Sequence, residues 1–432
     1  MKFAWASGRH RLLYLLPFAL VALATEIAFG VTNGRGVTWD FANYYDVGHK
    51  VSAGEVENLY NKFALIEGKP PQGNMGFKGT PLSATFYIPL ASFSPRVALV
   101  LFKVQNTLAT LAALFLLFWQ LKRFGEASFG SQAAFLSLFL TFVAVYQPFW
   151  RVYAIGGQTT PTVFLLLVLA LICHLKGGRD FLVALFFSLA VTIKPAFVLG
   201  LAVLALLSGR KLLIYTIGIG VTLAAMSIVL MGWGTHEAFL RYALSEQATS
   251  WATNSSLTVA LDNLRGMLRP PPEPLPYVIM SAMIRLGVSG LLIGLFLRYR
   301  SRISSEPARR HLDFVLSITS CLLIMPVVWA HYLSLLFIPL SYCLAVSTAL
   351  PRTARWLLGA ILVASLAQSV NVVAQIQAMI VVNTWPEMLA VGLLKSLPLG
   401  LTAFLLLRYR KELVQTYVSP QWGAGKPAAV TA

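Results

Sequence analysis

Long apolar tracts recur along most of the chain, separated by short segments that carry Lys, Arg, Gly and Pro. A tract of about 20 apolar residues is long enough to cross the hydrocarbon core of a bilayer as an α-helix. The pattern therefore predicts an all-α polytopic membrane protein with about twelve transmembrane helices. The expected spans are 12–31, 97–121, 130–149, 160–175, 180–193, 196–208, 212–231, 276–297, 313–328, 332–350, 356–376 and 386–407.

Three polar segments and one short apolar tract interrupt this pattern. The first span is followed by a loop at 32–79, and the Pro-flanked tract at 80–93 predicts an interfacial or re-entrant helix. A second long loop at 232–275 contains "NSSLTVALDNLRGML", whose apolar period indicates an amphipathic interfacial helix. A polar tail covers 408–432. We expect residues 1–432 to form a single integral membrane domain.

Composition supports the membrane assignment. The chain has 432 residues, of which 57% are hydrophobic and 12% are charged, and its mean hydropathy is +0.71. Because a soluble protein carries about a quarter charged residues, no separate soluble domain of any size is expected.

The net charge of +18 does not indicate nucleic-acid binding, because the basic residues are scattered between apolar tracts. An N-terminus in the cytoplasm places basic loops such as "LKRFG", "HLKGGRD" and "RYRSRISSEPARRH" on the cytoplasmic side, as the positive-inside rule requires. This N-in and C-in orientation puts the loops at 32–79 and 232–275 on the outer face. The first span lacks a small-residue cleavage site, so we expect it to be an uncleaved helix.

The sequence gives no indication of a metal or a cofactor. Cys173, Cys321 and Cys343 lie in or beside apolar tracts, without the CxxC or Cys/His spacing of a metal site. A Walker loop, an HExxH pair and a dinucleotide fingerprint are also absent from the sequence. We therefore expect neither a metal nor a cofactor.

The segment "TWDFANYYDVGHKVSAGEVENLY" at 38–60 follows the first span and carries Asp40 among aromatic side chains. A carboxylate at the membrane interface beside Tyr44 and Tyr45 is expected to be partly desolvated, which raises its pKa and suits it to general-base catalysis. The alternative is structural, with Asp40 capping a short helix whose aromatic face lies on the lipid surface. The residues alone leave both interpretations open.

Two cations on the outer face run against the positive-inside bias. Arg151 and Lys194 suit charge-assisted hydrogen bonds to a phosphate, and the alternative is that both side chains snorkel to the interface. Gln158, in "GGQTTP", is either a ligand-binding amide at a helix start or the polar tip of a tight turn.

The segment "PVVWAHYLSLL" joins two expected spans on the outer face. Its His331 suits phosphate binding or proton transfer, and the alternative is a hydrogen-bonded structural histidine. Trp329 is typical of the aromatic belt at a membrane interface.

Six segments follow one another in a recognisable order: "WDFANYYDVGHKVSAGEVENLY", "TPLSATFYIPLASFSP", "IGGQTTPTVFLLL", "AVTIKPAFVL", "NSSLTVALDNL" and "PVVWAHYLSLLFIPL". Together they resemble glycosyltransferase family 87, the polyprenyl-phosphate-mannose-dependent membrane mannosyltransferases, over residues 38–345. The chain departs from the family pattern at three positions. The second Pro of a Y-P-P motif is absent, since Tyr87 is followed by Ile88 and Pro89. Ser255 stands for a Gln, and Tyr332 for the second residue of a His pair.

The resemblance implies a GT-C-type glycosyltransferase fold with short interfacial helices in the first outer loop. It also implies a catalytic aspartate in that loop, at the position of Asp40. The enzyme would transfer a sugar, expected to be mannose, from a polyprenyl-phosphate donor to a lipid or glycan acceptor with inversion. Its site would face the periplasm or cell exterior from a bacterial cytoplasmic (inner) membrane. Residues expected to bind donor phosphate or substrate are Lys194, Arg151, His331, Gln158, Tyr44, Tyr45, Tyr87, Asn254 and Trp329.

Two other functions fit parts of the same pattern. A transporter or flippase for a lipid-linked anionic substrate would line its pathway with the same cations, but the sequence shows no inverted internal repeat. A structural membrane protein would use the interfacial helices as a docking surface for a partner.

Overall fold

The computed structural model describes residues 13–32, 40–60, 77–146, 148–149, 157–245, 255–259, 261, 274–300, 303, 305–366 and 385–418. These residues form α-helices and 3-10 helices joined by short turns, and no strand occurs among them. An all-α fold is therefore confirmed for the described part of the chain.

The chain divides into two compact units, which are described separately. The Asp40 unit comprises Thr25–Ala113 and Pro148–Thr249. The C-terminal unit comprises Met1–Ala24, Leu114–Gln147 and Ser250–Ala432. Two helices, α2 (Leu15–Thr32) and α5 (Pro95–Phe129), contribute residues to both units.

Within the described residues, the helices long and apolar enough to cross a membrane are Pro95–Phe129, Arg210–Met231 and Pro276–Arg298. They agree with the spans expected at 97–121, 212–231 and 276–297. The shorter apolar helices are Leu15–Thr25, Gln132–Val145, Thr160–Lys176, Asp180–Ile193, Pro195–Ser208 and His331–Ala345. Membrane character is thus supported by three helices, and the expected number of twelve spans is not confirmed.

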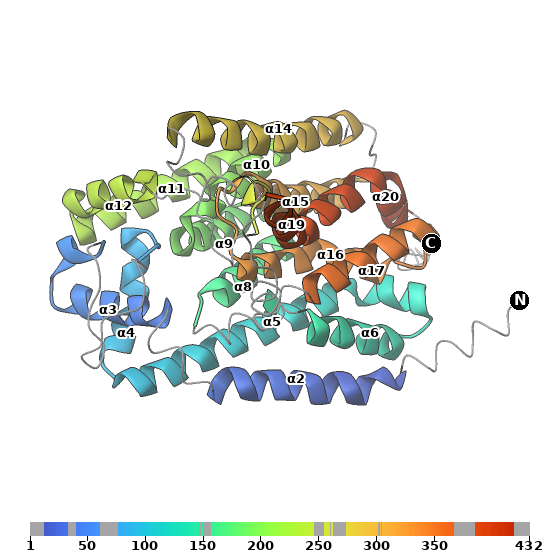
Figure 1. Ribbon diagram of the computed structural model, residues 1–432, viewed down its shortest axis with the longest axis horizontal. Helices are drawn as coiled ribbons and strands as arrows, with labels where there is room; N and C mark the ends of the chain where they lie inside the picture. Colours follow the sequence, from blue (N-terminus) through green and yellow to red (C-terminus); the bar gives the residue numbers. More distant parts are fainter. Residues whose placement is uncertain are drawn as a thin grey trace, which may run out of the picture. The chain divides into compact units, whose positions relative to one another are not determined.

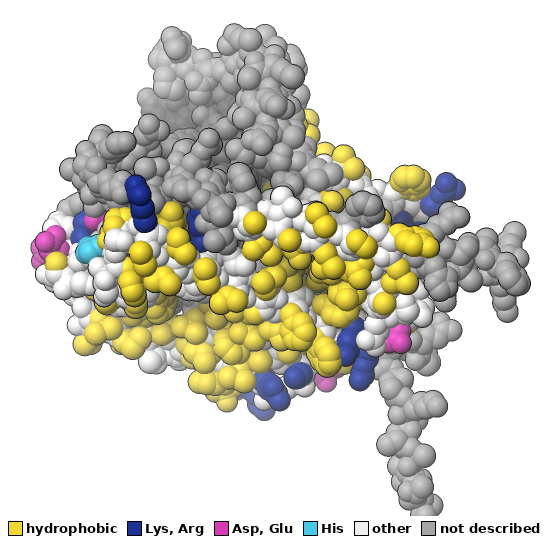
Figure 2. Space-filling view, turned by 90° about the horizontal axis from the view of Figure 1, so that it is seen from below, with side chains coloured by type: hydrophobic (Ala, Val, Ile, Leu, Met, Phe, Trp, Pro, Cys, Tyr) yellow, Lys and Arg dark blue, Asp and Glu magenta, His cyan; other side chains and the backbone are white. Residues whose placement is uncertain are grey.

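The surface of α5 fits a helix in contact with lipid. Seen from the side on which α5 lies in Figure 1, hydrophobic side chains cover most of the described surface (Figure 2). The exposed hydrophobic residues of α5 include Val97, Val100, Leu108, Phe115 and Trp119. Water would disfavour so many exposed apolar side chains on one helix, whereas lipid does not.

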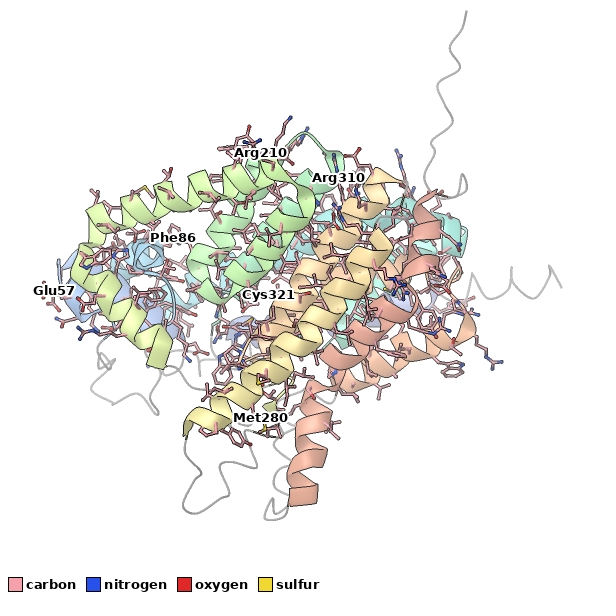
Figure 3. All side chains as sticks on the ribbon, turned by 90° about the horizontal axis from the view of Figure 1, so that it is seen from above. Glu57, Phe86, Arg210, Met280, Arg310 and Cys321 are labelled. Atoms are coloured by element: carbon pink, nitrogen blue, oxygen red, sulfur yellow. The ribbon has the colours of Figure 1, made fainter. Side chains whose placement is uncertain are left out.

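In the Asp40 unit, α8 (Thr160–Lys176) and α9 (Asp180–Ile193) pack together as a helical hairpin, and α11 (Arg210–Met231) packs on α9. Figure 3 labels Arg210, the first residue of α11. The unit also contains the elements α3 (Asp40–Ser52), η2 (Val56–Asn58), η3 (Pro81–Tyr87), α4 (Ile88–Ala91), η4 (Pro195–Phe197), α10 (Val198–Ser208) and α12 (Trp233–Ser245). In Figure 1, α3, α4 and α12 lie at one end of this unit.

The first outer loop is built on an aromatic cluster, which we define as Phe41, Tyr44, Tyr45, Phe77, Tyr87 and Phe102. Helix α3 supplies three of these rings, and each is buried against η3, α4 or the start of α5. Large aromatic side chains contribute much of the stability of such a core. The aromatic face of α3 is therefore a packed core and not a face that lies on lipid.

Gly48 permits the close approach of α3 to η3. A Cβ at this position would lie 2.3 Å from the carbonyl oxygen of Tyr87, which no side chain tolerates without a backbone shift.

The short, Pro-flanked tract expected at 80–93 forms η3 and α4, so it is too short to span a bilayer, as expected.

The C-terminal unit contains α6 (Gln132–Val145), α14 (Pro274–Arg300), α15 (Glu306–Ile324), η5 (Ala330–Leu336), α16 (Phe337–Ala345), α17 (Arg352–Leu366), α19 (Trp385–Arg408) and α20 (Arg410–Val418). Helix α15 packs against α14, on which Figure 3 labels Met280. The Arg300 guanidinium contacts the buried Asp313 carboxylate, with Nε 2.9 Å from Oδ1 and Nη2 3.0 Å from Oδ2. This bidentate pair fastens the end of α14 to α15.

The span expected at 332–350 is not confirmed by the structure. The chain there forms the 3-10 helix η5, then α16, which ends at Ala345. Pro339 lies in the first turn of α16, where its missing N–H breaks no helical hydrogen bond, so a new helix begins just before it.

Candidate active site

Three side chains from distant parts of the Asp40 unit form a continuous hydrogen-bonded chain. Gln158 Nε2 donates to Asp40 Oδ2, and Lys194 Nζ donates to Gln158 Oε1 at 3.0 Å. Asp40 is the first residue of α3, Gln158 lies two residues before α8, and Lys194 follows α9 directly. The structure therefore brings together three residues that the sequence singled out separately.

The loop before α8 holds Gln158 by its backbone. Asn106 Nδ2, on α5, donates to the Gln158 carbonyl oxygen at 2.8 Å. The preceding Gly157 has φ +80°, and a Cβ there would lie 3.2 Å from Phe41 Cβ and 3.3 Å from the Phe102 ring. Glycine suits this position because it adopts the left-handed region without strain and leaves room for both aromatic residues.

The end of α9 is tied to the segment that precedes η3. Thr80 donates to the Thr192 carbonyl oxygen through its Oγ1 at 2.7 Å and through its backbone N–H at 3.3 Å. Lys194 caps α9, and its own N–H donates to the Ala190 carbonyl oxygen at 2.9 Å. These contacts fix the backbone from which the Lys194 side chain extends.

The environment of Asp40 combines burial with positive charge. Burial raises the pKa of the Asp40 carboxyl above its ordinary value, and Lys194, Gln158 and Lys78 oppose that rise, in this order. Asp40 keeps part of its surface exposed, whereas Gln158 and Lys194 are each only 7% exposed. The carboxyl is thus a group whose pKa is raised by burial and whose charged form is supported by a buried amide and a buried ammonium.

Lys78 was not predicted from the sequence. It lies two residues before the Thr80 that contacts α9 and is close enough to Asp40 for its charge to act on the carboxyl. The signal that could have found it is the one used for Lys194, a lysine in an outer loop against the positive-inside bias.

The three predicted tyrosines lie in the aromatic cluster. Tyr44 and Tyr87 stack with ring centroids 4.8 Å apart, and burial raises the pKa of both phenols far above the ordinary value. Tyr45 donates from its hydroxyl to the Phe93 carbonyl oxygen at 2.8 Å. Tyr44 lies near Asp40, whose charge also raises its pKa, while Tyr45 serves to hold α3 against the segment after α4.

Asp46 differs from Asp40 although both belong to α3. Its carboxylate pairs with Lys50 at 2.7 Å, one helical turn further on. An intrahelical pair of this kind contributes little beyond local helix stability. Asp46 is therefore a natural control for the role of Asp40.

His331 and Trp329 belong to the C-terminal unit. The Ser255 N–H donates to the Val328 carbonyl oxygen at 2.6 Å, and the His331 ring packs edge-on against Tyr332 with centroids 4.6 Å apart. His331 is buried in η5. The residue before Trp329 is thus hydrogen-bonded to Ser255, which follows the predicted Asn254.

Arg151 and Asn254 lie outside the described residues. Within the part of the chain that the structure describes, no group of three His, Cys, Asp or Glu side chains is arranged to hold a metal ion. Cys173, Cys321 and Cys343 are buried free thiols.

The described residues thus combine an all-helical fold, helices long and apolar enough to cross a membrane, and a carboxylate held by an amide and an ammonium. The chain belongs to glycosyltransferase family 87, whose sequence profile matches residues 77–326. The match includes Lys78, Gln158 and Lys194 and begins after α3. The chain matches no curated protein and no solved structure. It is therefore a glycosyltransferase, as the resemblance predicted.

We predict that Gly157→Ala lowers the thermal unfolding midpoint in detergent more than Gly54→Ala does. Both glycines have similar positive φ angles, +80° and +78°, so both substitutions carry a backbone cost of about 1–2 kcal/mol. Only at Gly157 does the added Cβ also press on Phe41 and Phe102, since nothing lies within 4 Å at Gly54. Equal shifts for the two variants would contradict the packing described for the Gln158 loop.

Proposed function

We propose that this glycosyltransferase uses a polyprenyl-phosphate sugar donor, with mannose as the expected sugar, and a lipid or glycan acceptor. Transfer occurs with inversion at the outer face of the cytoplasmic membrane. Asp40 is the general base. Neither a metal nor a cofactor is part of the proposed reaction.

The observation that carries the proposal is the setting of the Asp40 carboxylate. Asp40 is partly exposed as a residue, and its Oδ2 is held by the buried Gln158 amide with Lys194 behind it. A carboxyl whose pKa is raised by burial accepts a proton more readily than an ordinary aspartate does. The catalytic aspartate implied by the family resemblance falls on this same residue.

The reaction is a displacement at the anomeric carbon. Asp40 takes the proton of the acceptor hydroxyl, and the acceptor oxygen forms a bond to that carbon. The bond between the carbon and the phosphate oxygen breaks, and the polyprenyl phosphate leaves with the bonding electron pair. Attack from the side opposite to the leaving phosphate inverts the configuration, so base and phosphate lie on opposite sides of the sugar.

The charges around Asp40 match such a donor. One carboxylate and two lysines, Lys194 and Lys78, leave a net charge of +1 among the described groups that act on this site. A polyprenyl-phosphate sugar is a phosphodiester with one negative charge. After transfer Asp40 is neutral and the released phosphate monoester approaches two negative charges, so the positive charge left on the two lysines favours the product state at longer range.

Sugar transfer is tested most directly with the purified protein in liposomes. The liposomes receive radiolabelled polyprenyl-phosphate mannose and a total lipid extract that supplies acceptors. Label in a new lipid product supports the proposal. Movement of the donor across the bilayer without a new product would support a transporter or flippase instead, and the absence of both would contradict the donor named here.

We predict that Asp40→Asn reduces kcat by at least about 10²- to 10⁴-fold, the usual contribution of a general base. The amide keeps the size of the side chain and most of its helix-capping capacity, so the unfolding midpoint should change little. Asp46→Asn, which breaks only the pair with Lys50, is the matched control and should retain most activity. An active Asp40→Asn beside an inactive Asp46→Asn would show that the base is misassigned within α3.

We predict that Lys78→Met raises the KM for the donor by roughly 10-fold or more, with a smaller effect on kcat. Lys78 is partly exposed and its charge reaches Asp40, so it is placed to contact a bound phosphate. Loss of one charge-assisted hydrogen bond has an effect of this size. The control is Lys50→Met, and steady-state kinetics that give the same donor KM for both variants would count against a phosphate contact at Lys78.

We predict that a cysteine at Glu57 reacts with a membrane-impermeant maleimide in intact cells and that a cysteine at Glu306 does not. Both side chains are exposed in the structure, so only the membrane can protect either of them. Figure 3 labels Glu57 at an outer edge of the Asp40 unit. The native cysteines are buried, which makes the unsubstituted protein the blank. Labelling at 306 from outside would reverse the proposed orientation.

A further inference from the structure

The orientation of the Gln158 amide is set by both of its neighbours. The Lys194 ammonium has only donors, so it must face Gln158 Oε1. An ionised Asp40 carboxylate has only acceptors, so it must face Gln158 Nε2. Both contacts require the same orientation, and the amide is therefore polarised in one direction from Lys194 toward Asp40.

The amide is also fixed in position. Its backbone carbonyl accepts a hydrogen bond from Asn106 on α5, and the side chain is 7% exposed. The Gly157 turn before it fits closely between Phe41 and Phe102. Gln158 is thus held at its backbone and at both ends of its amide, which leaves little freedom to rotate toward a substrate.

We propose that Gln158 and Lys194 are positioning residues for the base and do not bind the donor phosphate. Gln158 holds Asp40 Oδ2, which leaves Oδ1 to accept the proton of the acceptor hydroxyl. Lys194 keeps the Gln158 amide in the orientation that donates to Asp40. Its positive charge, separated from Asp40 by the Gln158 amide, also helps to keep the carboxylate ionised. This assignment rests on the proposed function and replaces the phosphate-binding role that the sequence indicated for both residues.

The groups that face Asp40 come from three segments. Lys194 follows α9, Lys78 precedes η3 and Tyr44 lies on α3. The pKa of Tyr44 is raised by burial and by the Asp40 charge, so this phenol stays neutral over the working range. Removing Lys194 therefore leaves Lys78 as the described cation that opposes burial of Asp40, and the pKa of the carboxyl rises further.

The test is the pH dependence of kcat/KM for the acceptor, measured with donor KM for the wild type, Lys194→Met, Gln158→Leu and Lys50→Met. For Lys194→Met we expect the acidic limb to move to higher pH. Donor KM should stay at the wild-type value, and activity should recover at alkaline pH, where Asp40 is ionised without help. Lys50→Met, which removes a lysine paired with Asp46, should match the wild type in every respect.

For Gln158→Leu we expect a loss of about 10- to 100-fold, the effect of one hydrogen bond to a charged group. Its acidic limb should also move to higher pH, but activity should not recover at alkaline pH, because Oδ2 has lost the group that holds it. If this variant fails to fold, as judged by its thermal unfolding, the Lys194→Met profile decides alone.

Two results would overturn the inference. One is an acidic limb at the wild-type pH in Lys194→Met, and the other is a raised donor KM in that variant without movement of the limb, which would identify a phosphate ligand. Failure of the proposed function looks different, since the wild type would then transfer no sugar or Asp40→Asn would remain active.

Discussion

Partial removal of the Asp40 carboxylate from water is the constraint on which the rest of its unit depends. A carboxylate packed among aromatic rings is strongly destabilised unless hydrogen-bond donors and cations surround it. Gln158, Lys194 and Lys78 are the groups that offset this effect. Two of them come from the loops that begin α8 and follow α9, so the α8–α9 hairpin serves to bring an amide and an ammonium to the first residue of α3. Without that delivery, burial would favour a protonated carboxyl that accepts no proton.

Contacts within the same unit also fix the positions of these loops. The aromatic cluster fixes α3, Asn106 holds the loop of Gln158, and Thr80 holds the end of α9. Each contact joins a loop to a helix or to another loop, so Asp40, Gln158 and Lys194 are positioned by residues outside their own short segments. A site held in this way has its geometry before substrate arrives, which is the condition for efficient proton transfer.

The sequence was sufficient to identify the membrane class, the family and three of the residues that meet at the site. Asp40, Gln158 and Lys194 were recognisable because each is a polar group in a loop of a very apolar chain. Their mutual contact was not predictable, since 118 residues separate Asp40 from Gln158 and 36 separate Gln158 from Lys194. The number of spans is not confirmed for a different reason. An apolar tract buried inside a helical protein, such as α16, has the same composition as one that faces lipid. Tyr45 shows a further limit, because an aromatic residue beside a candidate base is equally suited to packing.

The amide between Asp40 and Lys194 has a physical rationale of its own. At an effective dielectric constant of about 20, unit charges about 3 Å apart attract by about 5.5 kcal/mol, and charges about 5 Å apart by about 3.3 kcal/mol. A lysine in direct contact would stabilise the carboxylate so strongly that its basicity, and with it its value as a base, would fall. Without Lys194, only Gln158 and Lys78 among the described groups would oppose burial, and the pKa of the carboxyl would rise further. One interposed glutamine places the cation between these limits and, because its amide must donate to the carboxylate, also determines which oxygen remains to take the proton.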